Sequence, residues 1–223
     1  MDPLKPRINQ DPPEEKGYIL LPAHILATPV ISDIDGDGNY EIVVPVSYYF
    51  DANEEMSISQ EIEIEKYVAG GIVVVDIASH KIKWSLHLDL TTDKSAYKAY
   101  LFSSPTVIDM NGDKKQEIII GTGVGFVYVL NSEGGVVSPW PMMTDSISSQ
   151  IVVEDINNDG NMELIVLDNK DNLICFSYTG QELWEIQIKG NNGMQVSHVR
   201  TISYFILEIS LQLALFWSAS FYC

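Results

Sequence analysis

Positively charged residues are scarce in this 223-residue chain: 13 lysines and arginines stand against 31 aspartates and glutamates, which gives a formal net charge of −18. Binding to nucleic-acid phosphates needs clustered Lys and Arg side chains. The acidic surplus therefore argues against a nucleic-acid partner. Cysteine is scarcer still, with Cys175 in a predicted strand and Cys223 at the last position. Two cysteines form no disulfide framework, and Cys175 is expected to be a buried, small apolar residue.

Targeting signals are missing as well. Residues 1–22 form a polar, proline-rich extension without the apolar segment of a signal peptide, and the chain has no N-x-Ser/Thr glycosylation sequon. These residues therefore show no means of entering the secretory route, and they leave the location of the protein open.

Familiar catalytic motifs are also absent. The chain has no G-x-S-x-G elbow, and its four histidines lack the H-E-x-x-H spacing of zinc enzymes. The segment GTGVGF, residues 121–126, lacks the last glycine of a dinucleotide-binding loop and is predicted to be a strand end and hairpin turn. We therefore expect no enzyme.

What the chain has instead is an acidic loop in three copies: DIDGDGNYE (33–41), DMNGDKKQE (109–117) and DINNDGNME (155–163). Oxygen-bearing side chains occupy positions one, three, five and nine of each copy, and in calcium loops alternate side chains turn inward around the ion. Turn residues alone explain one such loop, but not a spacing held three times. We predict up to three Ca²⁺ sites. The candidate ligands, including two asparagines at position seven, are Asp33, Asp35, Asp37, Asn39, Glu41, Asp109, Asn111, Asp113, Glu117, Asp155, Asn157, Asp159, Asn161 and Glu163.

An EF-hand is the familiar alternative for such a loop, and it requires a bidentate glutamate at position twelve and a helix on each side. Position twelve here is Val44, Ile120 or Val166, each within a short, β-branched run. Further short apolar stretches precede the loops, and both sets have the composition of strands. The predicted unit is therefore strand, calcium loop, strand.

The spacing of the loops predicts a repeat architecture. Asp109 follows Asp33 by 76 residues, and Asp155 follows Asp109 by 46. Without a polar insert in the first unit, a period of about 45 residues remains, which is the length of a four-stranded propeller blade. Each unit ends in a strand, a turn and a second strand with a tryptophan (Trp84, Trp140 or Trp184), which we expect to pack between blades.

The predicted fold class is therefore all-β, with about three four-stranded blades of an incomplete β-propeller. The predicted divisions are an extension at 1–22, a first blade at 23–99 with an acidic insert at 47–66, a second blade at 100–145, a third blade at 146–200 and an apolar tail at 201–223.

The loops and their strands resemble the FG-GAP, integrin-α-like repeats of calcium-binding β-propellers. Longer stretches, HILATPVISDIDGDGNYEIVVPVSYYFD, KYVAGGIVVVDI and YLFSSPTVIDMNGD, are similar to the plant Defective in Exine Formation family, over roughly residues 18–195. The resemblance implies a calcium-binding, membrane-associated protein of the secretory route, at the plasma membrane or endomembranes, that acts in primexine and pollen-wall patterning. The literal Phe-Gly and Gly-Ala-Pro signatures are absent, and Lys114 replaces the glycine of the second loop.

A fragment of a quinone-dependent propeller dehydrogenase is the less favoured alternative, because such enzymes also have tryptophan-bearing blades. Two non-enzymatic functions remain in view. The first is a calcium-stabilised propeller that binds a protein or cell-wall polysaccharide. The second is a purely structural fragment in which calcium only stabilises the loops. The insert at 47–66 distinguishes them, because it places six acidic residues beside Tyr48, Tyr49 and Phe50, and long loops in compact domains are often functional. A solvated acidic loop is the competing interpretation of the insert.

The three loops are not expected to bind calcium equally. The first has four carboxylates and Gly38 at position six, and the third has Gly160 there, whereas Lys114 must adopt a turn conformation that glycine takes easily. The second loop is therefore predicted to bind weakest.

The apolar tail at 201–223 breaks the repeat, because no ligand cluster begins at Thr201, where the next loop is due. A membrane anchor is one interpretation of the tail, although Glu208 near its middle opposes a span. We favour an unrelated ending.

Overall fold

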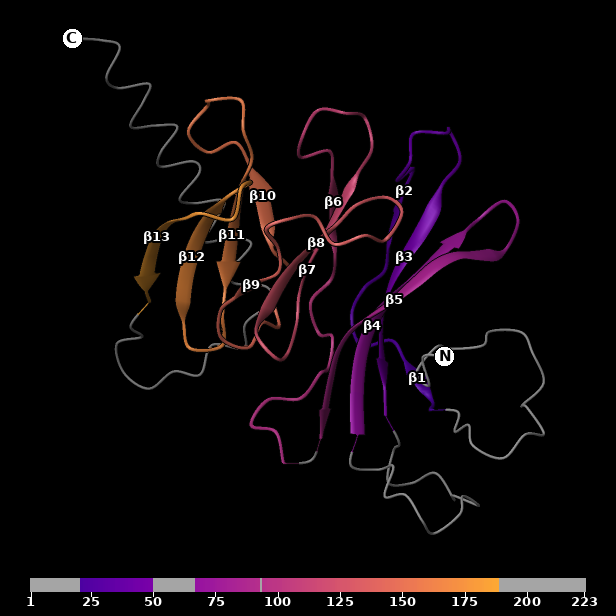
Figure 1. Cartoon of the computed structure of the whole chain (residues 1–223), viewed down its shortest axis with the longest axis horizontal. Helices are drawn as coiled ribbons and strands as arrows, with labels where there is room; N and C mark the ends of the chain where they lie inside the picture. Colours follow the sequence, from indigo (N-terminus) through magenta and orange to yellow (C-terminus); the bar gives the residue numbers. More distant parts are fainter. Residues whose placement is uncertain (1–20, 50–66, 93, 189–223) are drawn as a thin grey trace. The chain divides into compact units, whose positions relative to one another are not determined.

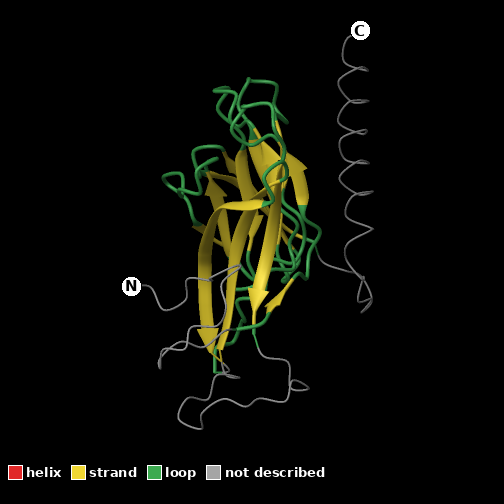
Figure 2. Cartoon of the chain, turned by 90° about the vertical axis from the view of Figure 1, so that its right-hand side faces the viewer, coloured by secondary structure: helices red, strands yellow, loops and turns green. Residues whose placement is uncertain are grey.

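The computed structural model describes residues 21–49, 67–92 and 94–188. All the regular secondary structure in these residues is β-strand, drawn yellow in Figure 2. The predicted all-β class is therefore confirmed. Over the same residues, the structure has no helix with the length and apolar character needed to cross a membrane. The 1–20 part of the extension, residues 50–66 of the insert and the 201–223 tail lie outside the described residues.

Within the described residues, thirteen strands form three antiparallel sheets (Figure 1). The first sheet contains β1 (Ala23–His24), β2 (Val30–Ser32), β3 (Glu41–Tyr48), β4 (Tyr67–Asp76) and β5 (Lys81–Thr92). The second contains β6 (Thr106–Ile108), β7 (Glu117–Gly121), β8 (Phe126–Leu130) and β9 (Met142–Met143). The third contains β10 (Val152–Glu154), β11 (Glu163–Leu167), β12 (Asn172–Ser177) and β13 (Glu182–Gln187).

Each sheet follows the order of the chain, as a propeller blade does. The second sheet runs β6-β7-β8-β9 and the third β10-β11-β12-β13. In the first sheet, β1 and β2 both pair with β3, at opposite ends of that long strand, and β4 and β5 follow. The sheet therefore has four strand positions, one of which β1 and β2 share.

The apolar runs of the strands follow from burial on both faces of a sheet. Successive side chains of a strand point to opposite faces. In β7, Ile118 and Ile120 join a core with the first sheet, whereas Ile119 joins a core with the third sheet. A strand covered on both sides has no solvent face on which alternating polar residues would be favoured.

The first strands of the three sheets lie next to one another, because β6 contacts both β2 and β10. Sheets stacked face to face with adjoining first strands are the arrangement of blades in a β-propeller. The fold is therefore propeller-like, with three sheets that resemble blades. β1–β5, β6–β9 and β10–β13 fall within the divisions 23–99, 100–145 and 146–200.

Two details of the sequence interpretation need correction. β3 continues to Tyr48, so the first two residues of the insert at 47–66 are strand. Trp140 precedes β9 instead of lying in it, although it is buried between the second and third sheets, as expected of a tryptophan that packs between blades. The predicted hairpin at 121–126 is confirmed, with Gly121 ending β7 and Phe126 beginning β8.

Candidate metal sites

The three acidic loops share one backbone conformation, which their own carboxylates stabilise. The loops join β2 to β3, β6 to β7 and β10 to β11. The aspartate at position one accepts a hydrogen bond from the N–H at position six in every loop, at 2.9 Å: Gly38 to Asp33, Lys114 to Asp109 and Gly160 to Asp155. The carboxylate at position five accepts from the N–H at position seven, at 2.8 Å each time: Asn39 to Asp37, Lys115 to Asp113 and Asn161 to Asp159.

The glutamate at position nine closes each loop and is almost completely buried. Glu41, Glu117 and Glu163 are 0%, 5% and 2% exposed. Each accepts a hydrogen bond from the N–H at position two of its own loop, from Ile34 at 3.1 Å, Met110 at 2.8 Å or Ile156 at 3.0 Å. A buried carboxylate is costly unless it is paired, so its occurrence at the same position of three loops indicates a shared role.

Two positions of each loop adopt a left-handed backbone. Position six has φ of 89° at Gly38, 71° at Lys114 and 90° at Gly160, so Lys114 does adopt the predicted glycine-like conformation. Position four is left-handed too, at Gly36, Gly112 and Asn158. The sequence interpretation missed this second requirement, although two glycines and an asparagine at one position were the signal for it.

In the first loop, three aspartates converge. Carboxylate oxygens of Asp33, Asp35 and Asp37 lie within 4.8 Å of one another, so this triad could hold a metal ion. Asp35 Oδ1 is buried and has no hydrogen-bond partner among the described residues. A buried oxygen without a partner carries a desolvation penalty that a cation would remove.

In the second and third loops, the asparagine at position three joins the other predicted ligands. Asn111 Nδ2 donates to Glu117 Oε1 at 3.2 Å and to Asp113 Oδ2 at 3.3 Å. Asn157 Nδ2 donates in the same way to Glu163 Oε1 at 3.3 Å and Asp159 Oδ2 at 3.0 Å. The side chains at positions three, five and nine thus meet in both loops.

Of the two asparagines at position seven, Asn161 contacts a predicted ligand through its side chain, whereas Asn39 does not in the contacts the structure shows. Asn39 and Asn161 are exposed. Each donates its backbone N–H to the aspartate at position five, and Asn161 also donates its amide to Asp159.

The electrostatics of the loops favour a cation. Burial raises the pKa of Glu117, and repulsion by Asp113 and Asp109 adds to the shift. Burial likewise raises the pKa of Glu163, with further repulsion from Asp159 and Asp155. The two glutamates are therefore crowded by negative charge and shielded from water, and a bound cation would relieve both effects.

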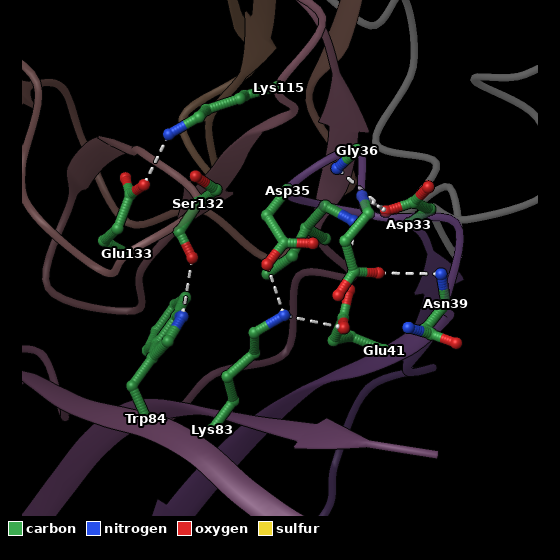
Figure 3. A network of polar contacts seen from close by, with 12 residues as sticks. Asp33, Asp35, Gly36, Asn39, Glu41, Lys83, Trp84, Lys115, Ser132 and Glu133 are labelled. Carbon is green, nitrogen blue, oxygen red and sulfur yellow. Dashed lines mark hydrogen bonds and ion pairs between the residues drawn. The ribbon is translucent and has the colours of Figure 1, made fainter. Parts of the chain in front are cut away.

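A lysine outside the first loop, which the sequence interpretation did not consider, contacts two of its carboxylates. Lys83 Nζ, from β5, lies 2.5 Å from Asp35 Oδ2 and 2.9 Å from Glu41 Oε1 (Figure 3). Burial alone would lower the pKa of Lys83, but the hydrogen bonds and charges of Asp35 and Glu41 outweigh it and raise that pKa. Lys83 follows Glu41 by 42 residues, and nothing in the local sequence indicated the contact.

Comparisons with known proteins give distant structural likenesses. No protein-family model matches the chain, and no curated protein matches it. Among solved structures, the chain is similar to BBS1N in complex with ARL6DN, soaked with lead, with a TM-score of 0.42 and 12% identity over 73% of this chain and 54% of that one. It is also similar to BamB from Moraxella catarrhalis, with a TM-score of 0.41 and 9% identity over 78% of this chain and 53% of that one. The chain thus spans about half the length of the structures it matches, and likenesses this distant bring no function to it.

Proposed function

We propose that the chain is a non-enzymatic, calcium-binding scaffold of the FG-GAP, integrin-α-like type, in which Ca²⁺ closes the loop between the first two strands of each blade. The observation that carries the proposal is the buried glutamate at position nine of all three loops. In the second and third loops it accepts from the asparagine at position three, and in the first it shares the Lys83 ammonium with Asp35. Three repetitions of one geometry are difficult to explain as solvated turns.

The side chains present fit Ca²⁺. The ion takes six to eight oxygen ligands and tolerates irregular geometry. Each loop offers at least three carboxylates, and the asparagines at position three contribute an amide oxygen after a rotation of the amide group. Asp35 Oδ1, buried without a partner among the described residues, is an oxygen that such an ion would satisfy. The residues expected to hold Ca²⁺ are those at positions one, three, five and nine: Asp33, Asp35, Asp37 and Glu41; Asp109, Asn111, Asp113 and Glu117; and Asp155, Asn157, Asp159 and Glu163.

The proposed role of such a scaffold is to present surfaces to a protein or cell-wall polysaccharide partner. The resemblance to the Defective in Exine Formation family suggests pollen-wall patterning as the process. The insert at 47–66 is the proposed contact segment. If its removal leaves binding to cell-wall polysaccharides and partner ectodomains unchanged, the insert is not the contact segment.

Calcium titration of the full chain by calorimetry, with thermal melting in EDTA and in excess Ca²⁺, tests the metal proposal. We expect binding heat and a higher melting temperature in Ca²⁺, because a ligand that binds the folded state stabilises it. Glu163→Gln should remove one binding event, whereas the matched variant Glu182→Gln, outside the loops, should leave all of them. Absence of both heat and a melting shift in the unsubstituted chain would refute calcium binding.

A further inference from the structure

We propose that the Lys83 ammonium is a resident cation of the first loop, so that Ca²⁺ binds there only by displacing it. The proposal rests on the calcium function proposed above and concerns how the three loops differ. It identifies Lys83 as the residue that sets the affinity of the first loop.

The first observation is the position of the ammonium group. Lys83 Nζ contacts one oxygen of Asp35 and one of Glu41, two of the predicted calcium ligands (Figure 3). Glu41 is fully buried, and the Lys83 side chain is 28% exposed. A cation between two carboxylates, one of them buried, reduces the repulsion between them, and such charge-assisted hydrogen bonds are strong.

The second observation is how the sheet directs this side chain. β4 and β5 pair Val74 with Trp84 and Val75 with Ile82, which leaves Lys83 as the extra residue of a β-bulge. A bulge re-aims the side chain it carries and is often found next to functional sites. Here, the bulge lies where β5 passes the first acidic loop.

The third observation is an internal comparison. The third sheet has the same bulge, because β12 and β13 pair Cys175 with Trp184 and Phe176 with Glu182, which leaves Leu183 as the extra residue. Both bulged residues precede a tryptophan, and the loop glutamates stand at matching registers, Glu41 opposite Asp76 and Glu163 opposite Ser177. The equivalent of Lys83 in the third blade is thus a leucine, which brings no charge to the third loop.

The second loop has no such resident cation either, among the contacts of the described residues. Lys115 is the basic side chain closest in sequence to its glutamate, and its ammonium pairs with Glu133 at 2.7 Å (Figure 3). Asn111 provides an amide, not a charge, to Glu117. Among the described contacts, the first loop therefore differs from the other two in having an ammonium group bonded to two of its predicted ligands.

This competition reverses the ranking of calcium affinity that the number of carboxylates would give to the first and third loops. The first loop has the most carboxylates, but Ca²⁺ must compete there with an intramolecular ammonium. Its apparent affinity is then lower than that of the third loop, and its folded shape is the least dependent on calcium.

A reciprocal exchange of the two bulged residues tests this. Calorimetric titration with CaCl₂ is made on full-length chains in which two of the three loops have lost a predicted ligand. Asp113→Ala with Asp159→Ala leaves the first loop intact, and Asp37→Ala with Asp113→Ala leaves the third intact. Lys83→Leu should tighten binding at the first loop by roughly tenfold or more, the scale of losing hydrogen bonds to charged groups. Leu183→Lys should weaken the third loop by a similar factor. Lys81→Leu, which removes the same charge two residues away, should change neither.

Thermal melting in EDTA gives a readout that needs no bound calcium. Lys83→Leu should lower the melting temperature of the otherwise unsubstituted chain in EDTA, and excess CaCl₂ should restore it, whereas Lys81→Leu should melt like the parent. If the unsubstituted chain binds calcium but neither Lys83→Leu nor Leu183→Lys changes the affinity of its loop, the role of Lys83 is refuted and the proposed calcium function stands. Absence of calcium binding in the unsubstituted chain and in Lys83→Leu would overturn the proposed function and the displacement together. If Lys83→Leu does not fold, Leu183→Lys decides by its effect on the third loop.

Discussion

At the scale of single residues, the acidic loops require a left-handed backbone conformation at two positions. Positions four and six are left-handed in all three loops. Glycine adopts this conformation without strain, asparagine adopts it at a small cost, and lysine adopts it least easily. The second loop is thus strained at Lys114, and the third carries Asn158 at its other left-handed position.

Replacing Lys114 by glycine should therefore stabilise the chain. Its φ of 71° costs an ordinary side chain about 1 kcal/mol, which glycine would not incur. We expect the free energy of unfolding in EDTA, measured by urea titration, to rise by about that amount. Asn158→Gly is the matched control, with a gain of only a few tenths of a kcal/mol, because asparagine tolerates this region. Equal gains for the two variants would contradict the assignment of strain to Lys114.

At the scale of elements, the sheets are joined by a contact that recurs from one blade to the next. The Trp84 ring of β5 lies against Gly134, in the hairpin turn of the second sheet, and its Nε1 donates to Ser132 O at 2.8 Å (Figure 3). Met142 of β9 lies against Gly180, in the hairpin turn of the third sheet. The last strand of each of these two sheets therefore packs on a glycine in the turn of the next sheet.

Gly134→Ala should disrupt the first of these contacts. A Cβ at Gly134 would lie 2.8 Å from Trp84 Cε3, and the φ of this glycine is +83°. Conformational strain and overpacking together should lower the free energy of unfolding in EDTA by about 2–4 kcal/mol. Gly112→Ala isolates the conformational part, since its φ is +78° and nothing lies within 4 Å of the added carbon. A loss no larger for Gly134→Ala than for Gly112→Ala would show that the Trp84 contact adds no stability.

The interface between the first two sheets also contains a carboxylate, Asp89 of β5, whose Oδ1 accepts from the Tyr128 hydroxyl at 3.1 Å. Burial raises the pKa of Asp89 above its ordinary value, and its Oδ2 is buried without a partner among the described residues. A raised pKa in the folded state means that the contribution of Asp89 to stability is present below its ordinary pKa and is lost as the pH rises through the raised value.

Asp89→Asn should therefore stabilise the chain at neutral pH and lose this advantage in acid. Urea titrations in EDTA between about pH 4 and pH 7 measure the difference. Asp76→Asn provides a control of opposite sign, because the Ser79 backbone N–H lowers the pKa of Asp76, so that its contribution is present at neutral pH and is lost in acid. A stability difference between Asp89→Asn and the parent that does not change with pH would contradict this account.

At the scale of the whole molecule, the two end sheets carry apolar side chains on the faces turned away from the second sheet. In the third sheet, Leu164 and Val166 face the second, so the alternation of side chains places Trp184 and Ile186 on the opposite face. In the first sheet, the corresponding outer face holds Val46 and Val73. A closed propeller needs at least four blades, and a further blade would cover such faces.

This arrangement predicts self-association through the third sheet. Ile186 is 56% exposed, and β13 pairs with β12 alone among the described strands. Exposed edge strands with apolar side chains tend to associate. Ile186→Lys should therefore shift sedimentation velocity profiles toward the monomer at high protein concentration, whereas Glu185→Lys, on the other face of β13, should have less effect. Unchanged association in Ile186→Lys would exclude this face as the contact.

The sequence by itself determined what depends on neighbouring residues. The carboxylate spacing and the β-branched runs predict strand, loop and strand because turns and alternation are local properties. The conformation of Lys114 was foreseeable for the same reason, since hydrogen bonds within nine residues impose it. The three blade-like sheets followed from the repeat length.

Tertiary structure alone decided the contacts between distant segments. The ammonium of Lys83 reaches Glu41 across 42 residues because β3, β4 and β5 pair in one sheet and a bulge turns the lysine toward the loop. The burial of the loop glutamates and the contact of Trp84 with Gly134 likewise depend on how the sheets pack. Such contacts follow from strand register and from the facing sheet, which no short stretch of residues encodes. The number of carboxylates in a loop could thus be predicted from the sequence, but the ammonium group that pairs with two of them in the first loop could not.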